Sequence, residues 1–250
     1  MDNLNTLRIN TDDGQIDLTN HNTCEKEVTF DKAEAYFKEL EKSLIEKINE
    51  HRNGFIFGSV AWLTSTNIIN ALSKCSNVQI LIQKEDFLRP DFGDNLEERK
   101  RRLKYRQLYA QLKFSHDRYD CQSPISSLSI CGDPTVDPVR CIGNFNSDQK
   151  RAMPRAHNKF LVFCKKIKPS SGQTRKNNEI IYEPIAVWTG SFNFTLNAER
   201  SFENGIYLED RTGQNAIIGS YLKEHHQIFA LSESLDWEHN WTEPEYRIGT

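Results

Sequence analysis

Short apolar runs and amphipathic stretches alternate through the first third of the chain. Residues 55–63 (FIFGSVAWL) and 78–83 (VQILIQ) are nearly continuous apolar runs, which are typical of buried strands. Between them, Thr66 is placed to cap a helix over residues 67–74. Strand, helix and strand in this order predict a sheet whose faces are covered by helices.

The segment before the first apolar run has a different pattern. Residues 31–50 (DKAEAYFKELEKSLIEKINE) carry apolar side chains at helical spacing, and Asp31 is suited to cap the helix that they predict. Residues 27–30 (EVTF) predict a short strand just before it. The polar residues 1–28 are expected to form a segment of their own, ahead of a single domain over residues 29–250.

In the second half the pattern becomes mainly extended. Residues 95–114 predict a strongly basic helix, and residues 115–138, rich in Ser, Pro, Asp and Cys, predict irregular structure. Four strands are then expected, at residues 139–144, 159–164, 179–190 and 204–210. A short helix after residue 195 and an amphipathic helix over residues 214–234 complete the pattern. The predicted fold class is α/β, with a mixed central β-sheet flanked by helices on both faces.

Composition narrows the class of protein. The chain has 250 residues, of which 37% are hydrophobic and 27% charged, as in a soluble globular domain. The net charge of -3 provides no global positive field, so any surface for a polyanion has to be local. The N-terminal stretch lacks the apolar core of a signal peptide, and no apolar run is long enough to cross a bilayer. We therefore expect a cytoplasmic protein without stable membrane insertion.

The six cysteines do not form a familiar metal-binding pattern. No CxxC pair occurs, and Cys121, Cys131 and Cys141 are spaced ten residues apart, which is a weak signal for a zinc site. In a chain without an export signal they are expected to be reduced thiols. We predict neither a bound metal nor a cofactor.

The sequence HNKF at residues 157–160 contains the first candidate for chemistry. On a strand, side chains two residues apart point to the same face, so His157 and Lys159 point together. An imidazole nitrogen can attack a phosphorus atom while an ammonium group neutralises the phosphate oxygens. By itself this pair also fits a surface histidine and lysine on one strand.

Two further segments supply groups suited to a phosphate. Gly190 lets the backbone approach an anion, and Ser191 and Asn193 offer a hydroxyl and an amide. The same residues also fit a turn that caps the next helix. Glu203 precedes an apolar strand, where its carboxylate is placed to accept a hydrogen bond from an imidazole and fix its tautomer. It also fits an ordinary glutamate at a strand end.

Taken together, HxK, GSxN and the Glu203–Asn204 pair resemble the signature of the phospholipase D superfamily. The combination is most similar to the small bacterial endonucleases of that superfamily, which carry a single motif, and the resemblance covers residues 31–85 and 138–231. It implies a metal-independent phosphodiester hydrolase that works through a phosphohistidine, with His157, Lys159, Ser191, Asn193 and Glu203 as catalytic residues. Because that mechanism needs two HxK motifs and the chain has one, we expect a homodimer with the site on its two-fold axis.

Two departures from the family pattern affect this interpretation. Cys164 occupies the place of the family aspartate, seven residues after the histidine. It is an odd number of residues from His157, so on a regular strand it faces the other side of the sheet. The second departure is a pair of insertions, at about 86–137 and 165–183, of which the latter is expected to be a basic β-hairpin that extends two strands.

Local positive charge favours nucleic acid, DNA or RNA, as the substrate. Residues 99–106 contain six basic side chains in eight positions, although Glu97 and Glu98 also make a solvated helix face a reasonable interpretation. The predicted substrate-binding residues are Gly190, Arg155, Lys165, Arg101 and Arg102. A phospholipase or phosphatidyl transferase, or a catalytically silent nucleic-acid-binding module, are the alternatives, because fold alone does not decide function.

Overall fold

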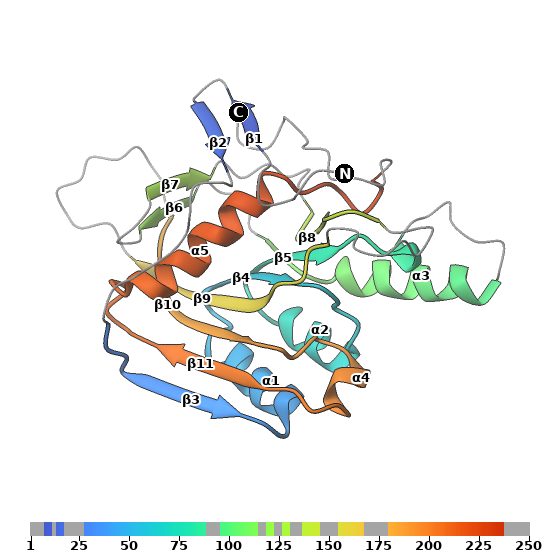
Figure 1. Ribbon diagram of the computed structural model, residues 1–250, viewed down its shortest axis with the longest axis horizontal. Coiled ribbons are helices and arrows are strands. Elements are labelled where there is room, and N and C mark those ends of the chain that lie inside the picture. Colours follow the sequence, from blue (N-terminus) through green and yellow to red (C-terminus); the bar gives the residue numbers. More distant parts are fainter. Residues whose placement is uncertain are drawn as a thin grey trace.

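The computed structural model describes residues 8–11, 14–17, 28–88, 96–114, 119–122, 127–130, 137–145, 155–167 and 180–237. Its centre is a mixed sheet with the strand order β3-β11-β10-β9-β4-β5-β8 (Figure 1). The strands are β3 (Lys32–Tyr36), β4 (Phe55–Val60), β5 (Asn77–Gln83), β8 (Val139–Ile142), β9 (Lys159–Ile167), β10 (Ile180–Gly190) and β11 (Gly205–Glu209). The β4, β5 and β8 strands pair in parallel, whereas β9 to β3 pair antiparallel. The predicted mixed sheet is confirmed.

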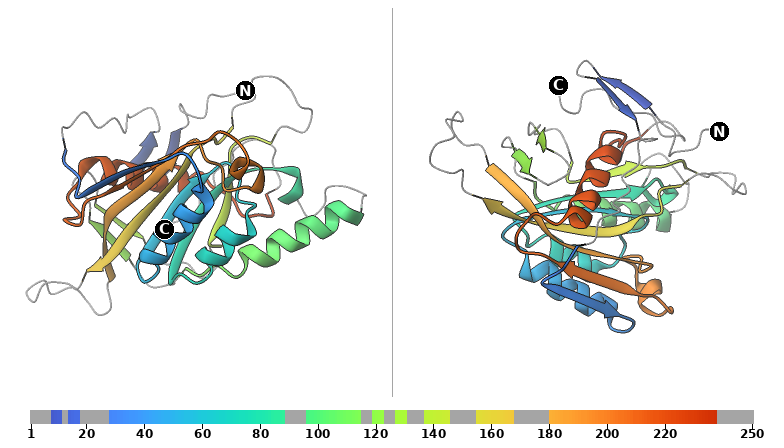
Figure 2. Two further views of the ribbon diagram at one scale, coloured as in Figure 1. Left: turned by 90° about the horizontal axis from the view of Figure 1, so that it is seen from below. Right: turned by 60° about the vertical axis from the view of Figure 1, so that its left-hand side comes forward.

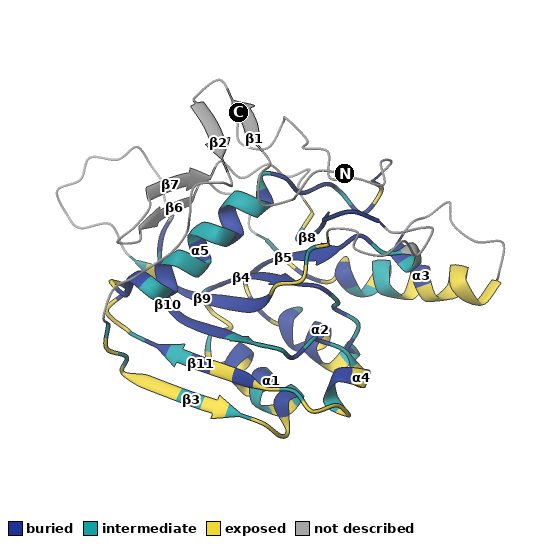
Figure 3. Ribbon diagram, viewed as in Figure 1, coloured by how far each residue is buried: buried dark blue, intermediate teal, exposed yellow. Residues whose placement is uncertain are grey.

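Helices cover both faces of this sheet. The α1 (Leu40–Glu50) and α2 (Thr66–Leu72) helices lie on one face and α5 (Ala216–Phe229) on the other, as two further views show (Figure 2). Leu161 of β9 belongs to the core on the α1 side, and Val162 belongs to the core under α5. Side chains of consecutive strand residues point to opposite faces, so β9 supports both layers. The central strands β4 and β5 are buried throughout, whereas the edge strand β3 is mainly exposed (Figure 3).

The helix predicted over residues 31–50 is wrong in its first part. Residues 32–36 form β3, which pairs antiparallel with β11, and the helix starts only at Leu40. The sequence KAEAY alternates between more and less exposed positions, so the backbone hydrogen bonds offered by β11 stabilise a strand there. Glu39, with φ 52°, turns the chain from strand to helix. Asp31 does not cap this helix; its side chain accepts a hydrogen bond from the backbone N–H of Arg211 at 2.8 Å.

Several smaller predictions are also corrected. No strand forms at residues 28–30, and Ser65 rather than Thr66 caps α2, because its hydroxyl accepts from the Ile68 N–H at 3.2 Å. Two short strands occur in the stretch predicted to be irregular, β6 (Tyr119–Gln122) and β7 (Ser127–Ile130), and β6 pairs in parallel with β10. Within the polar N-terminal segment, β1 (Arg8–Thr11) pairs antiparallel with β2 (Gly14–Asp17).

The β9 and β10 strands pair antiparallel on either side of the predicted basic hairpin. Their antiparallel register continues as far as Ile167 opposite Ile181, so both strands extend well past the centre of the sheet. Residues 168–179, which connect them, lie outside the described part of the chain. The basic helix is α3 (Leu96–Tyr109), and it packs beside the 3₁₀ turn η2 (Asp86–Leu88).

Candidate active site

The three sequence motifs meet at one edge of the sheet. Lys159, at the start of β9, pairs with Val60 at the end of β4, and Gly190, at the end of β10, pairs with Gly205 at the start of β11. Antiparallel pairing therefore brings the beginning of one strand beside the end of the next. The short helix α4 (Leu196–Glu199) follows β10 at the same edge (Figure 1).

His157 and Lys159 lie close enough to act on one group. The Lys159 Nζ is 3.0 Å from the His157 Nδ1 and donates to the His157 backbone carbonyl at 2.8 Å. Lys159 is buried, whereas His157 is exposed at the surface. Partial burial and the positive charges of Lys159 and Arg155 lower the pKa of His157, so its imidazole is neutral near pH 7. A neutral imidazole has a free lone pair, which is what a nucleophile requires.

Burial also lowers the pKa of Lys159, and the nearby carboxylate of Glu203 partly opposes this shift. Glu203 is therefore within electrostatic reach of the His157–Lys159 pair. Its hydrogen bond, however, comes from the Ser191 hydroxyl, which in turn accepts from the Asn204 backbone N–H at 3.0 Å. In the described part of the chain, the expected bond from the His157 imidazole to Glu203 is not made. The carboxylate positions Ser191 instead, because the turn after β10 places that hydroxyl directly beside it.

The turn after β10 depends on a glycine. Gly190 has φ 153°, and a Cβ atom there would lie 2.3 Å from the backbone oxygen of Asn204. That same oxygen accepts a hydrogen bond from the Ser191 N–H at 3.1 Å. Asn193 follows, and its buried Oδ1 has no hydrogen-bond partner among the described residues. The glycine and serine of GSFN are thus explained by a tight crossing between two chain segments at this edge.

Trp62 and Glu85 belong to the site but were not predicted. The Trp62 Nε1 donates to Glu85 at 2.8 Å, and Arg155 forms an ion pair with the same carboxylate. The Trp62 ring meets the His157 ring edge-on, with 6.0 Å between their centroids. Trp62 and Glu85 follow the two parallel strands β4 and β5, so polar or aromatic residues just after buried strands were the signal that could have revealed them.

Two cavities flank the His157–Lys159 pair. One, of about 570 Å³, is lined by both residues and by Gly190, Tyr221 and Glu224, and it lies towards α5. The other, of about 830 Å³, lies towards α3 and reaches Asn193 and Glu203. We call this second cavity the α3 groove. His157, Lys159 and Gly190 thus line the cavity towards α5, whereas Asn193 and Glu203 line the α3 groove together with Trp62.

The structure separates the predicted substrate-binding residues. Arg101 lines the α3 groove with its side chain exposed, whereas Arg102 also lines it but is 4% exposed. Lys165 lies six residues along β9 from Lys159, roughly 20 Å away at the usual rise of a strand. It pairs with Glu183 at 3.3 Å and donates to the Arg211 carbonyl at 2.7 Å, so it stands away from the candidate site.

Cys164 lies on the face of β9 opposite Lys159, as its position in the strand predicted. It is 1% exposed and belongs to the core that includes Phe55, Phe57 and Val162. The position at which the sequence resemblance would place an aspartate is therefore occupied by a packing residue under α5. Cys75 and Cys141 are also buried free thiols, and within the described ranges no group of three or more His, Cys, Asp or Glu side chains is arranged to hold a metal ion.

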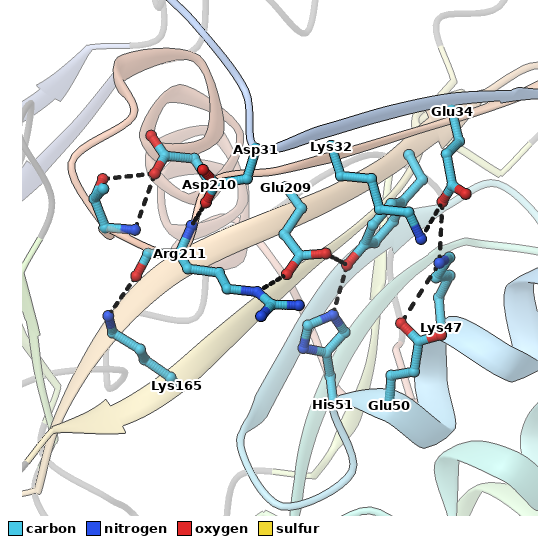
Figure 4. Close-up of polar contacts among 12 residues, drawn as sticks. Asp31, Lys32, Glu34, Lys47, Glu50, His51, Lys165, Glu209, Asp210 and Arg211 are labelled. Carbon is cyan, nitrogen blue, oxygen red and sulfur yellow. Dashed lines mark hydrogen bonds and ion pairs between the residues drawn. The ribbon is translucent and has the colours of Figure 1, made fainter.

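A second polar cluster, between β11, β3 and α1, is separate from the site (Figure 4). Tyr207 donates to Glu209 at 3.1 Å and lies 2.8 Å from the His51 Nε2, while Lys47 pairs with Glu34 at 3.0 Å. Burial alone would raise the pKa of Glu34, but its hydrogen bonds with Lys32 and Lys47 lower that pKa to about 2. These bonds satisfy polar groups where α1 packs on the sheet, and we assign them a structural role.

The fold and the site together define an α/β domain with HxK, GSxN and Glu–Asn elements at one sheet edge. Its sequence resembles the phospholipase D superfamily, and its fold is similar to that of Nuc, a phospholipase D family member from Salmonella typhimurium. That similarity has a TM-score of 0.43 at 14% identity over 81% of this chain and 97% of Nuc. NucT from Helicobacter pylori is also similar, with a TM-score of 0.46 at 14% identity over 81% of this chain and 98% of NucT.

Among curated proteins, the chain is similar to the uncharacterized protein L381 of Acanthamoeba polyphaga mimivirus. The two are 28% identical over 222 residues, which are 85% of this chain and 70% of the viral protein. No family model matches the chain. Of the helices that the structure describes, none combines the length and the apolar character needed to span a membrane.

Proposed function

We propose that the protein is a metal-independent phosphodiesterase that cleaves nucleic acid, with His157 as its nucleophile. The observation that carries this proposal is the contact between the His157 imidazole and the Lys159 amino group, 3.0 Å apart, at the edge where Gly190 and Ser191 also lie. The lowered pKa of His157 favours its neutral form there. The imidazole supplies the lone pair and the ammonium supplies positive charge for the phosphate oxygens. The motif resemblance supports the same reaction class.

The reaction takes place in two displacements. A nitrogen of His157 attacks phosphorus, a nitrogen–phosphorus bond forms, and the bond to the leaving oxygen breaks. That oxygen takes a proton from a second imidazole. Water then attacks the phosphohistidine, gives a proton back to the second imidazole, and releases the phosphate monoester with His157 restored. Lys159 and the Ser191 hydroxyl stabilise the charge on the phosphate oxygens in both steps.

The second imidazole is His157 of another copy of the chain, so the active form is a homodimer with the site on its two-fold axis. Exposed apolar side chains at the same sheet edge support such a contact. Phe202, one residue before Glu203, is 108% exposed, Leu196 of α4 is 56% exposed, and Phe37, next to the end of β3, is 71% exposed. Large apolar groups gathered on one rim are characteristic of interfaces between proteins.

The test is incubation of single- and double-stranded DNA and RNA with the pure protein in EDTA, beside His157→Ala. We expect the wild type to cleave at least one of these substrates and the variant to be at least about 100-fold slower. Denaturation at alkaline pH, where a phosphorus–nitrogen bond survives, should recover a nucleotide bound through phosphorus to His157. If neither protein cleaves any substrate, or if both cleave at equal rates, the proposed function is wrong. Binding without turnover, unchanged by His157→Ala, would instead identify a silent binding module.

A further inference from the structure

We infer that the α3 groove binds unpaired bases, so that the substrate is a single-stranded nucleic acid which enters the site along α3. This inference rests on the proposed function, because it concerns the same nucleic-acid substrate and says that the substrate is single-stranded and where it enters the site. The groove begins beside His157 at Trp62 and continues to Phe87, Arg101 and Tyr105, residues of η2 and α3. These two elements fall in the segment outside the family resemblance.

The chemistry of the groove suits the flat faces of bases. Trp62, Phe87 and Tyr105 are all partly exposed, and the rings of Phe87 and Tyr105 are 5.4 Å apart between centroids. The Arg101 guanidinium lies 4.8 Å from the centre of the Phe87 ring. Aromatic rings and guanidinium planes are the surfaces on which proteins stack bases that are not paired. In a duplex the base faces are covered by their neighbours, and only edges and phosphates are offered.

The acidic residues of the groove do not oppose this assignment. Glu85 forms an ion pair with Arg155 and accepts a hydrogen bond from Trp62, and Glu203 accepts from Ser191. Glu41 accepts from Ser65 and from Asn67, both at 2.6 Å. Glu98 is an exposed carboxylate near the basic side chains of α3. On the α3 side the groove therefore presents aromatic surface and more basic than acidic side chains, and the carboxylates elsewhere in its lining accept hydrogen bonds.

Tyr105 is also held in place. Its hydroxyl donates to the Thr64 carbonyl at 3.4 Å, across the groove from α3 to the segment before α2. Arg106 anchors the same helix by donating to the Leu88 and Leu235 carbonyls, both at 2.8 Å. A stacking platform has to be rigid to bind without a large loss of side-chain entropy. Two arginines of α3 thus have different roles: Arg106 anchors the helix, and Arg101 lines the groove where the bases would bind.

The experiment measures binding by a His157→Ala protein, so that turnover does not interfere. The probes are a dye-labelled 15-residue oligo(dT), an abasic strand with the same number of phosphates, and a duplex of equal charge. We expect oligo(dT) to bind roughly tenfold or more tighter than the abasic strand and than the duplex. Phe87→Leu and Arg101→Gln should bring the ratio of oligo(dT) to abasic affinity towards one.

Arg99→Gln is the matched control, because it removes the same charge from α3 at a residue that does not line the groove. It should weaken oligo(dT) and abasic binding by the same factor. Equal affinity of the wild-type groove for the two strands, or a duplex bound as tightly as oligo(dT), would overturn the inference. Binding to anionic vesicles in place of all three probes would do the same. Hydrolysis in EDTA is measured separately. If the protein cleaves nucleic acid but binds oligo(dT) and the abasic strand equally, this inference is wrong and the proposed function stands.

Discussion

At the scale of single residues, the charge state of His157 decides whether the site can work. Partial burial and the positive charge of Lys159 lower the pKa of His157, so the imidazole loses its proton below its usual pH range. The acidic limb of the rate profile should follow this group, with activity rising as pH increases through its pKa. We predict that Lys159→Gln moves that limb to higher pH, in addition to reducing the maximal rate.

The measurement is kcat/KM against pH for a soluble phosphodiester, with an NMR titration of the imidazole as a second readout. Arg99→Gln, which changes a charge on α3, serves as the control and should leave the limb in place. A limb that stays at the same pH in Lys159→Gln would show that the two groups are not electrostatically coupled in the reacting enzyme.

Cys164 and Glu203 should respond oppositely to substitution. Cys164→Asp places a carboxyl group in an apolar core, which should reduce the free energy of unfolding by roughly 2–5 kcal/mol and change the rate of the folded fraction little. Glu203→Gln weakens the acceptor that positions Ser191, so the rate should fall by roughly 100-fold with the fold intact. Urea unfolding and hydrolysis assays on both variants, beside Cys164→Ala, check this pair. The reverse pattern would place the supporting carboxylate at position 164.

At the scale of elements, α5 carries a buried titratable pair. His225 and His226 pack against Phe57, and burial lowers the pKa of His226 to about 4 and that of His225 well below its usual value. Below about pH 6.5 the unfolded chain binds protons that the folded chain does not. The free energy of unfolding should therefore be highest above pH 6.5 and fall as the pH drops towards 4, by about 1.4 kcal/mol per pH unit for each histidine.

His225→Phe removes two ring nitrogens from the buried interface between α5 and Phe57. We predict that it flattens this pH dependence and stabilises the protein at pH 5. Urea unfolding between pH 4.5 and 7.5 provides the comparison, with Arg99→Gln, which removes no histidine, as a control that keeps the wild-type slope. An unchanged slope in His225→Phe would mean that another group causes the acid sensitivity.

At the scale of the whole molecule, the proposed dimer accounts for the single HxK motif. Phe202 is the most exposed of the apolar side chains near the site. We predict that Phe202→Asp produces a monomer with at least about 100-fold lower activity, because each site loses its second imidazole. Light scattering coupled to size-exclusion chromatography, with an activity assay on each fraction, measures both effects.

Leu103→Asp is a suitable control, since Leu103 is 58% exposed on α3 and stands apart from the rim formed by Phe37, Leu196 and Phe202. It should remain dimeric. A wild-type monomer that retains full activity would contradict the proposed arrangement, as would a Phe202→Asp dimer with an unchanged rate.

Much of the fold was predictable because its signals are local. The buried strands β4 and β5 and the helix α5 follow from apolar runs and helical periodicity, and the opposite orientations of Lys159 and Cys164 follow from strand geometry alone. The β3 strand was missed because residues 32–36 have a helical pattern, and only pairing with β11, some 170 residues later in the chain, makes them extended.

The sequence by itself determined the chemical groups of the candidate site, since HxK, GSxN and Glu–Asn are contiguous patterns whose residue types suit a phosphate. Tertiary structure alone decided what surrounds them. It places the Trp62 ring beside His157 and forms the groove along α3. In the folded chain Glu203 accepts a hydrogen bond from Ser191 and not from the imidazole, and Lys165 lies at the other end of β9. The physical reason is that such contacts join residues far apart in the chain, and their geometry depends on how strands and helices pack together.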